Sequence, residues 1–164
     1  MVQLKRRTKE KSKQSDEYGT PQALYAALYS EFACVLDVCA SSKNHKCLRY
    51  YTQADDGLKH VWAFSNWCNP PYSNILPWVM KAVTERDSGS TTVMLVKYDP
   101  STKHGALIHS EADEIRLITH RIKFEGATQT CNFPCAIAVF RPPAFCSHKS
   151  SPRILTVDYR EILK

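Results

Sequence analysis

The sequence predicts a single α/β domain built on a mostly parallel sheet, with antiparallel strands toward the C-terminus. Two patterns carry this prediction: strand-like and helix-like segments alternate over the first two thirds of the chain, and strand-like segments cluster in the last third. The length of 164 residues suits one hydrophobic core. Hydrophobic residues make up 43% and charged residues 23%, which excludes a wholly disordered chain.

Two amphipathic helices are predicted, and a third, weaker one at 101–111. Thr20 and Pro21 are typical of an N-cap and a first helical residue, so the first helix is expected to follow them over 22–32. Asn74 is expected to cap the second helix, which ends near 87–90. The apolar positions of this second helix repeat at helical spacing: Leu76, Val79, Met80 and Val83.

Short apolar runs predict strands at 34–39, 66–69, 91–96, 114–118, 122–124 and 135–140. Pro70 and Pro71 end the second run, because proline cannot continue a hydrogen-bonded ladder. Asp37 lies within the first run, where a carboxylate is costly unless it has a partner or a function. The expected division is a basic flexible arm at 1–15, one folded domain at 16–143 and a C-terminal extension at 144–164, whose structure the sequence leaves open.

The formal charge of +6 is concentrated at the N-terminus. The first thirteen residues contain six Lys and Arg and one Glu, so the remaining chain is nearly neutral. Such an arm is solvated and can contact an anionic partner. None of the five glycines forms a GxG pair, which excludes Rossmann and Walker phosphate loops. Apolar runs are too short for a membrane span and no signal-peptide core is present, so we expect a cytoplasmic protein with reduced cysteines and no metal site.

The most informative motif is Asn69-Pro70-Pro71-Tyr72, which follows a predicted strand and matches the catalytic motif of amino methyltransferases. An exocyclic amine on an aromatic ring is a poor nucleophile, because its lone pair is delocalised. The Asn69 side-chain oxygen and the Pro70 carbonyl can accept its two hydrogens and stabilise the positive charge that develops on attack. Tyr72 offers a face on which a flipped base can stack. The tetrapeptide alone is also compatible with a proline-stiffened turn.

From about residue 16 to 142 the chain resembles the phage and prophage N6-adenine DNA methyltransferases of the Dam type. The landmarks that carry the resemblance occur in order: Asp16-Glu17-Tyr18-Gly19-Thr20-Pro21, Val35-Leu36-Asp37-Val38-Cys39-Ala40, Tyr51-Thr52, Asp55-Asp56-Gly57-Leu58, Trp67-Cys68-Asn69-Pro70-Pro71-Tyr72-Ser73, Trp78-Val79-Met80-Lys81-Ala82, Glu114-Ile115-Arg116-Leu117-Ile118, Arg121-Ile122-Lys123-Phe124 and Ala138-Val139-Phe140-Arg141-Pro142.

This resemblance implies the fold of S-adenosylmethionine-dependent methyltransferases, with S-adenosylmethionine as methyl donor and adenine in double-stranded DNA as acceptor. It implies a monomer or weak dimer encoded by a phage or prophage, which acts in the bacterial cytoplasm without a membrane. The implied catalytic residues are Asn69, Pro70, Pro71 and Tyr72. The implied cofactor-binding residues are Tyr18, Thr20, Pro21, Asp37, Ala40, Asp55 and Asp56. Carboxylates suit this cofactor, since its hydroxyl and amino groups all donate hydrogen bonds.

Two other functions remain open from the sequence. The same tetrapeptide can serve methylation of a glutamine side-chain amide in a protein, although the basic arm and the additional landmarks favour DNA. A non-catalytic DNA-binding phage protein that retains the fold is the third hypothesis. It is motivated by His104-Gly105, which stands where the resembled enzymes have an aromatic pair. A satisfied core carboxylate is the alternative interpretation of Asp37, and a plain turn that of 55–57.

Overall fold

A computed structural model of the chain describes residues 16, 18–145 and 151–164. Its seven strands form one sheet in the order β2-β1-β3-β4-β6-β5-β7. The strands are β1 (Leu36–Asp37), β2 (Arg49–Tyr50), β3 (Ser65–Cys68), β4 (Thr91–Lys97), β5 (Glu114–Ile118), β6 (Cys135–Phe140) and β7 (Arg153–Val157). The helices are α2 (Gln22–Phe32), α3 (Leu76–Asp87), α4 (Lys103–Glu111) and α5 (Tyr159–Ile162), with short 3-10 turns η1 (Gly57–Lys59) and η2 (Pro143–Phe145).

Strand β6 is the reversed strand of the described sheet. Strands β1 to β4 pair in parallel, and β7 is parallel to β5. Strand β6 lies between β4 and β5 and is antiparallel to both. The predicted α/β domain, with a mostly parallel sheet and antiparallel pairing toward the C-terminus, is therefore confirmed.

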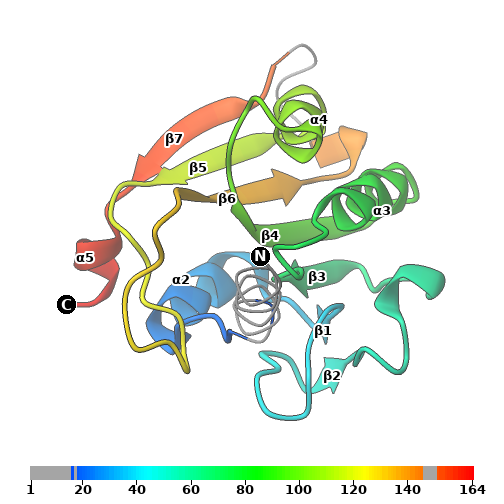
Figure 1. Cartoon of the computed structure of the whole chain (residues 1–164). Helices are drawn as coiled ribbons and strands as arrows, with labels where there is room; N and C mark the ends of the chain where they lie inside the picture. The colour runs from blue at the N-terminus through cyan, green and yellow to red at the C-terminus, as the bar shows by residue number, and fades with distance from the viewer. Residues whose placement is uncertain (1–15, 17, 146–150) are drawn as a thin grey trace, which may run out of the picture.

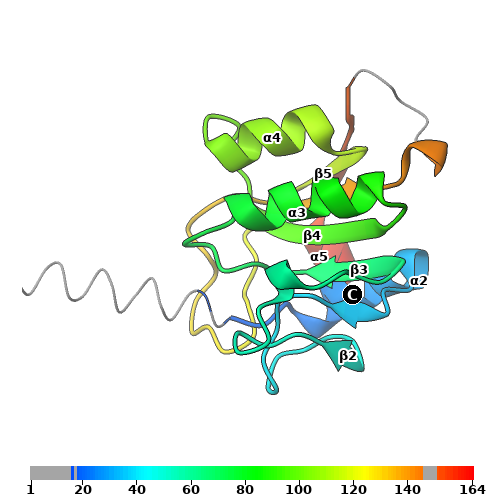
Figure 2. The ribbon, with the colours of Figure 1, turned by 90° about the vertical axis from the view of Figure 1, so that its right-hand side faces the viewer.

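Helices cover both faces of the sheet, which makes three layers (Figures 1 and 2). Helices α3 and α4 lie on one face, and α2 and α5 on the other. Residues of the central strands alternate between the two layers. Met94 and Val96 of β4 pack with the α3 and α4 side, whereas Val93 and Leu95 pack with the α2 and α5 side. This explains why β4 is apolar throughout rather than alternating.

The helices confirm most of the predicted ranges but not their caps. Helix α2 has the predicted bounds, although Pro21 rather than Thr20 occupies its N-cap, without a side-chain cap bond. Ile75, not Asn74, is the N-cap of α3. Met80 was also assigned wrongly to the buried face, since 57% of it is exposed. The buried face is centred instead on Trp78, whose ring stacks on that of another tryptophan, Trp62, at 6.4 Å between centroids.

Residues 122–124 do not form the predicted strand. Ile122 and Phe124 are buried and Lys123 is exposed, which is the alternation of a strand. However, no neighbouring strand pairs with this segment within the described residues; only an isolated bridge links Glu125 to Gly19. The run at 34–39 contributes only the two residues of β1 to the ladder.

The C-terminal residues continue the domain. Strand β7 extends the sheet beyond β5, and α5 contacts α2. The sheet therefore includes residues past the expected boundary at 143. The expected basic arm at 1–15 lies outside the described residues. Among those that are described, no helix combines the length and the apolar character needed to span a bilayer.

Candidate active site

The predicted site residues gather along one edge of the sheet. Strands β2, β1, β3 and β4 are neighbours and parallel, so their carboxyl ends meet at the same edge. The segments that follow them contain the predicted Asp55 and Asp56, Ala40, and Asn69 to Tyr72, and Asp37 is the last residue of β1. Ligands of open α/β sheets bind at this edge.

The Asn69 side chain has a defined orientation. Its Nδ2 donates a hydrogen bond to the Tyr18 carbonyl at 3.1 Å. A carbonyl oxygen only accepts hydrogen bonds, so the amide nitrogen must face it and Oδ1 must point away. Within the described residues, neither the Asn69 Oδ1 nor the Pro70 carbonyl takes a hydrogen bond. Both oxygens are therefore uncommitted, and their role as acceptors for a target amine stays a prediction.

The segment before α2 is attached to the motif at two points and to Glu125 at a third. The Asp16 carboxylate accepts hydrogen bonds from the Ser73 backbone N–H at 3.0 Å and the Ser73 hydroxyl at 2.6 Å. Tyr18 binds Asn69 as described, and Gly19 exchanges two backbone hydrogen bonds with Glu125, at 3.3 and 2.9 Å. Sequence reasoning missed the role of Asp16, although this residue begins the first landmark of the resemblance.

Tyr72 belongs to a cluster of aromatic rings. Its ring lies nearly perpendicular to those of Phe124 and Phe133, at 5.8 and 5.3 Å between centroids, and Tyr18 stacks on Phe124 at 6.3 Å. Lys97 Nζ lies 5.5 Å from the centroid of the Phe133 ring. The Tyr72 hydroxyl is buried without a regular hydrogen-bond partner in the described chain, and burial raises its pKa well above 10. The two phenylalanines were not predicted as site residues. The signal available for Phe124 was its place at the end of a landmark of the resemblance, 121–124.

Asp37 is buried at the end of β1, and its oxygens are engaged by the following loop. Oδ1 accepts from the Cys39 N–H at 3.3 Å, and Oδ2 from the Lys46 N–H at 2.9 Å. Burial raises the pKa of Asp37 to about 6, against the lowering effect of these two bonds. Ala40 is fixed nearby, since its N–H donates to the Tyr51 carbonyl at 2.9 Å.

Asp55 and Asp56 form a turn after β2. Asp55 Oδ2 accepts from the Thr52 hydroxyl at 2.7 Å and the Thr52 N–H at 2.8 Å, and these bonds lower the Asp55 pKa. Its other oxygen takes no hydrogen bond from the described residues. Asp56 has a left-handed backbone with φ of 56° and pairs with Lys59 at 3.0 Å. Gly57 follows, and a Cβ there would lie 2.1 Å from the Val38 carbonyl. The turn is therefore held close to the end of β1.

Thr20 and Pro21 are buried at the start of α2, and Lys46 links this region to two neighbouring segments. Lys46 Nζ donates to Glu125 at 2.9 Å and to Gln22 at 3.2 Å. The loop after β1 and the loop before β6 are thereby connected across the start of α2. Lys46 was not predicted, because nothing in its sequence neighbourhood distinguishes it from the other lysines of the chain.

The residues His104 and Gly105, which depart from the resembled pattern, have local structural roles. The His104 Nε2 lies 3.1 Å from the Lys97 carbonyl, at the end of β4. A Cβ at Gly105 would lie 1.9 Å from the Asp99 carbonyl, so the close approach of α4 to the preceding turn requires glycine. Thr102 caps this helix by accepting from the Gly105 N–H.

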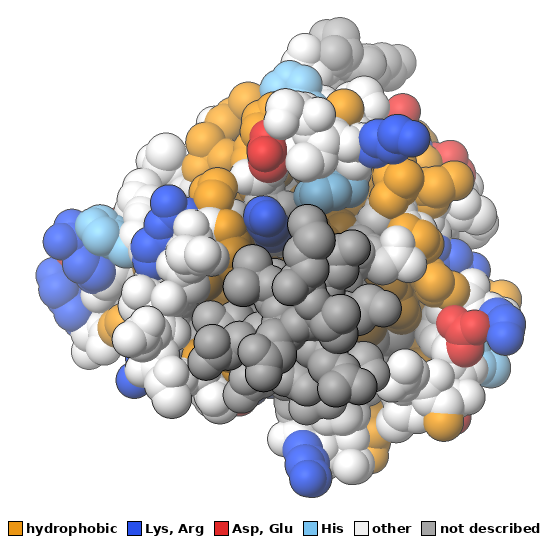
Figure 3. Space-filling view, in the orientation of Figure 1, with side chains coloured by type: hydrophobic (Ala, Val, Ile, Leu, Met, Phe, Trp, Pro, Cys, Tyr) orange, Lys and Arg blue, Asp and Glu red, His pale blue; other side chains and the backbone are white. Residues whose placement is uncertain are grey.

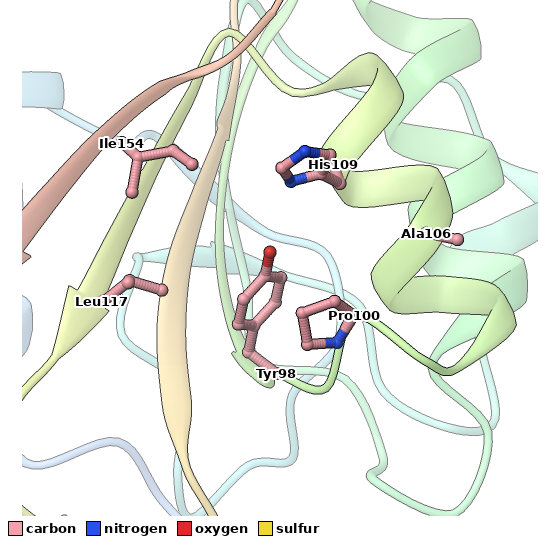
Figure 4. A pocket seen from close by; sticks show the side chains of 6 residues that line it. All are labelled: Tyr98, Pro100, Ala106, His109, Leu117 and Ile154. Carbon is pink, nitrogen blue, oxygen red and sulfur yellow. The ribbon is translucent and has the colours of Figure 1, made fainter.

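A cavity between α4 and strands β5 and β7 does not suit a nucleoside cofactor (Figure 4). Its lining is mostly apolar and consists of Tyr98, Pro100, Ala106, His109, Leu117 and Ile154. It contains no carboxylate to accept from hydroxyl or amino groups. In the described part of the chain, no three His, Cys, Asp or Glu side chains are grouped as a metal site.

Comparison with known proteins gives the same family as the motifs. The family model "DNA N-6-adenine-methyltransferase (Dam)" matches residues 7–161. A DNA N-6-adenine-methyltransferase of Haemophilus phage HP1 is 36% identical over 157 residues, covering 88% of this chain and 91% of the relative. A protein of the same description from Escherichia phage T1 is 32% identical over 103 residues, covering 61% of this chain and 43% of its own.

A third relative is the putative methyltransferase YfdM of Escherichia coli K12. It is 30% identical over 87 residues, which is 48% of this chain and 91% of the relative. The family match spans the aromatic cluster, the Asn69 motif and the turn after β2, and it includes β7 and most of α5. The chain belongs to the DNA N-6-adenine-methyltransferase (Dam) family.

Proposed function

We propose that this family member transfers a methyl group from S-adenosylmethionine to N6 of an adenine in double-stranded DNA, at the site formed by Asn69 to Tyr72. The observation that carries the proposal is the Asn69 hydrogen bond to the Tyr18 carbonyl at 3.1 Å. That bond leaves Oδ1 available beside the Pro70 carbonyl, and two acceptors are what an aromatic amine requires to become nucleophilic.

Asn69 and Pro70 act on the target amine. Each accepts a hydrogen bond from one of its two N–H groups, which draws the nitrogen lone pair out of conjugation and toward the methyl donor. The N–C bond to the methyl group would form as the sulfur–methyl bond of the donor breaks, and the methylated amine would then release one proton to solvent. As the nitrogen gains positive charge, both acceptors bind its hydrogens more strongly, so they stabilise the transition state more than the ground state. Proline contributes a carbonyl on a backbone with restricted φ. It has no N–H of its own that could hydrogen-bond to the acceptors in place of the amine.

Tyr72 supplies an aromatic face for the base that leaves the duplex. Phe124 and Phe133 pack nearly perpendicular to the Tyr72 ring and so restrict its plane. A fixed ring costs less entropy on binding than one that must be ordered, and stacking on an aromatic side chain contributes about 1–3 kcal/mol per base. Because the hydroxyl is buried, the ring rather than the hydroxyl is the part available to the base.

The residues at the ends of β1 and β2 fit the cofactor chemically. S-adenosylmethionine, when bound, supplies an electrophilic methyl group on a sulfonium. The uncommitted oxygen of Asp55 can accept from ribose hydroxyls, and Tyr51, whose ring stacks on His60 at 4.6 Å, can cover a purine. Tyr18, Thr20 and Pro21 border the methyl-transfer side. Asp37 supports the loop at 39–46 through its two backbone acceptor bonds, and Ala40 borders the same edge.

The partner proposed is double-stranded DNA in the bacterial cytoplasm, with the chain acting as a monomer or weak dimer. The formal charge of +6 favours association with a polyanion.

Methyl transfer tests the proposal directly. Purified protein is incubated with radiolabelled S-adenosylmethionine and unmethylated duplex DNA, and N6-methyladenine is identified in the digested product. Asn69→Ala is expected to lower kcat by about 10²–10³, the loss typical for one charge-stabilising hydrogen bond, while cofactor affinity changes little.

Three results would contradict the proposal. If DNA stays unlabelled while a protein glutamine gains the methyl group, the substrate is a protein. If DNA binds but S-adenosylmethionine does not, in calorimetry, the chain is a DNA-binding protein that retains the fold. If Asn69→Ala is as active as the unaltered protein, the catalytic assignment is wrong.

A further inference from the structure

The connection between β5 and β6 lies at the same edge as the Asn69 motif. Strand β5 is parallel to β4, because both pair antiparallel with β6. Its carboxyl end therefore meets the edge where β3 and β4 end, and the reversed strand β6 starts from that edge. Residues 119–134, which join the two strands, stay beside the site without crossing the sheet. We call this segment the β5–β6 loop; it is yellow in Figure 1.

The base of the β5–β6 loop is fixed in place. Ile122 and Phe124 are buried, with 0% and 3% of their surfaces exposed. The Cys131 N–H donates to the Ile122 carbonyl at 2.8 Å and closes the loop on itself. Glu125 pairs with the backbone of Gly19, as described. Because Phe124 and Phe133 also hold the Tyr72 ring, the loop and the motif form one rigid contact surface.

The tip of this loop presents polar side chains to solvent. Gln129, Thr130 and Asn132 are exposed, and none of them forms a side-chain hydrogen bond within the described residues. These amides and hydroxyl can both donate and accept, which is what base edges require. Asn and Gln in particular match adenine through two hydrogen bonds.

The charge around the loop is complementary to phosphate. Glu125, its only acidic residue, is paired with Lys46 at 2.9 Å. Arg121 and Lys123 are exposed and form no ion pair in the described part of the chain. Figure 3 shows Lys and Arg side chains gathered on the left of the face, where the loop and α5 lie in Figure 1. Cations without a carboxylate partner, beside uncharged hydrogen-bonding groups, are the composition expected of a DNA-contacting element.

We propose that the β5–β6 loop is the specificity-determining element of this enzyme: Gln129, Thr130 and Asn132 contact base edges beside the flipped adenine, and Arg121 and Lys123 contact the flanking phosphates. This inference rests on the proposed function, since it names residues that read the DNA methylated at the Asn69 site. It assigns the readers by their chemistry and leaves the sequence that they read to the experiment.

The test compares methylation rates on a random-sequence duplex library, read out by sequencing that detects N6-methyladenine. The variants Gln129→Ala, Thr130→Ala and Asn132→Ala are measured singly and together. Thr84→Ala, an exposed threonine on α3, is the matched control for Thr130→Ala. Arg121→Gln and Lys123→Gln are compared with Arg49→Gln. Arg49 is an exposed arginine on β2, the edge strand farthest from β5 and β7 in the strand order.

Loss of a base contact is expected to reduce the preference for the correct base at one position by about 5- to 100-fold, with the other positions unchanged. Arg121→Gln and Lys123→Gln are expected to weaken binding to all sequences alike and to lower the salt dependence by about one ion each. Thr84→Ala and Arg49→Gln are expected to behave as the unaltered protein.

The inference is overturned if the triple variant methylates the same sites with the same preference as the unaltered protein. It is also overturned if Arg121→Gln and Arg49→Gln change the salt dependence equally. Both outcomes require an active unaltered enzyme, so they are distinct from failure of the proposed function, in which the unaltered protein places no methyl group on DNA. Calorimetry with S-adenosylmethionine checks that each variant is folded.

Discussion

The buried carboxylate of Asp37 gives folding stability a pH dependence of defined sign. The folded-state pKa of Asp37 is about 6, raised from 3.8 by burial. Below about pH 3.8 the folded and unfolded states both hold the proton. Between these values the unfolded state releases it and the folded state keeps it, so the free energy of unfolding falls as pH rises. Above about pH 6 both states are ionised and the contribution is constant.

The magnitude follows from the two pKa values. At about 1.4 kcal/mol per pKa unit, the change from 3.8 to about 6 corresponds to a loss of about 3 kcal/mol between the ends of this range. Asp37→Asn removes the titration. An amide has one acceptor oxygen, whereas Asp37 serves two backbone N–H groups, so one of them loses its partner at a cost of about 1–3 kcal/mol.

Urea unfolding of the two proteins, at a series of pH values from about 4 to 8, measures the effect. The stability of the unaltered protein relative to Asp37→Asn is expected to fall as pH rises through the range, then level off. Asp55→Asn is the control: the Asp55 pKa is lowered from 3.8, so its contribution stays constant over this range and is lost only at lower pH. A difference between the unaltered protein and Asp37→Asn that stays constant with pH refutes the reasoning.

Three further changes test individual contacts of the site. Gly57→Ala places a Cβ 2.1 Å from the Val38 carbonyl, so we expect a loss of about 1–3 kcal/mol in unfolding free energy and weaker S-adenosylmethionine binding; unchanged thermal unfolding and affinity would contradict this. Asp16→Ala removes both acceptor bonds to Ser73, and a loss of about 1 kcal/mol in the positioning of the motif predicts a kcat about fivefold lower. An unchanged kcat would mean that Asp16 does not help to position Asn69. Tyr72→Phe removes a buried hydroxyl that forms no hydrogen bond of ordinary geometry and interacts with the Cys135 thiol, so stability is expected to change by no more than about 1 kcal/mol with kcat nearly unchanged; a large loss of kcat would give the hydroxyl a role.

Much of the fold could be predicted because the spacing of apolar residues indicates which side chains are buried. The bounds of α2 follow from such spacing, and β6 from a continuous apolar run. The same signal failed at Ile122 and Phe124. Their alternation reports which side chains are buried, but it contains no information on whether another strand lies beside the backbone.

The candidate site was predictable where it depends on side chains and hidden where it depends on the main chain. Asn69 and Tyr72 are recognisable in the sequence, because their chemistry lies in their side chains. The orientation of Asn69 depends on the backbone carbonyl of Tyr18. Every residue has such a carbonyl, so the residue type at position 18 does not reveal this contact. Likewise, that both oxygens of Asp37 serve the loop backbone depends on the path of that loop, and no residue type encodes it.

The brevity of two strands has a consequence for motion. Strands β1 and β2 each contain two ladder residues, whereas β4 contains seven. Few hydrogen bonds must break to open the β1–β2 side, so its amide protons will exchange with solvent sooner than those of the centre. A ligand seated at the ends of these strands selects the closed form and slows that exchange. The affinity for such a ligand therefore includes the free energy of ordering the weakest part of the sheet.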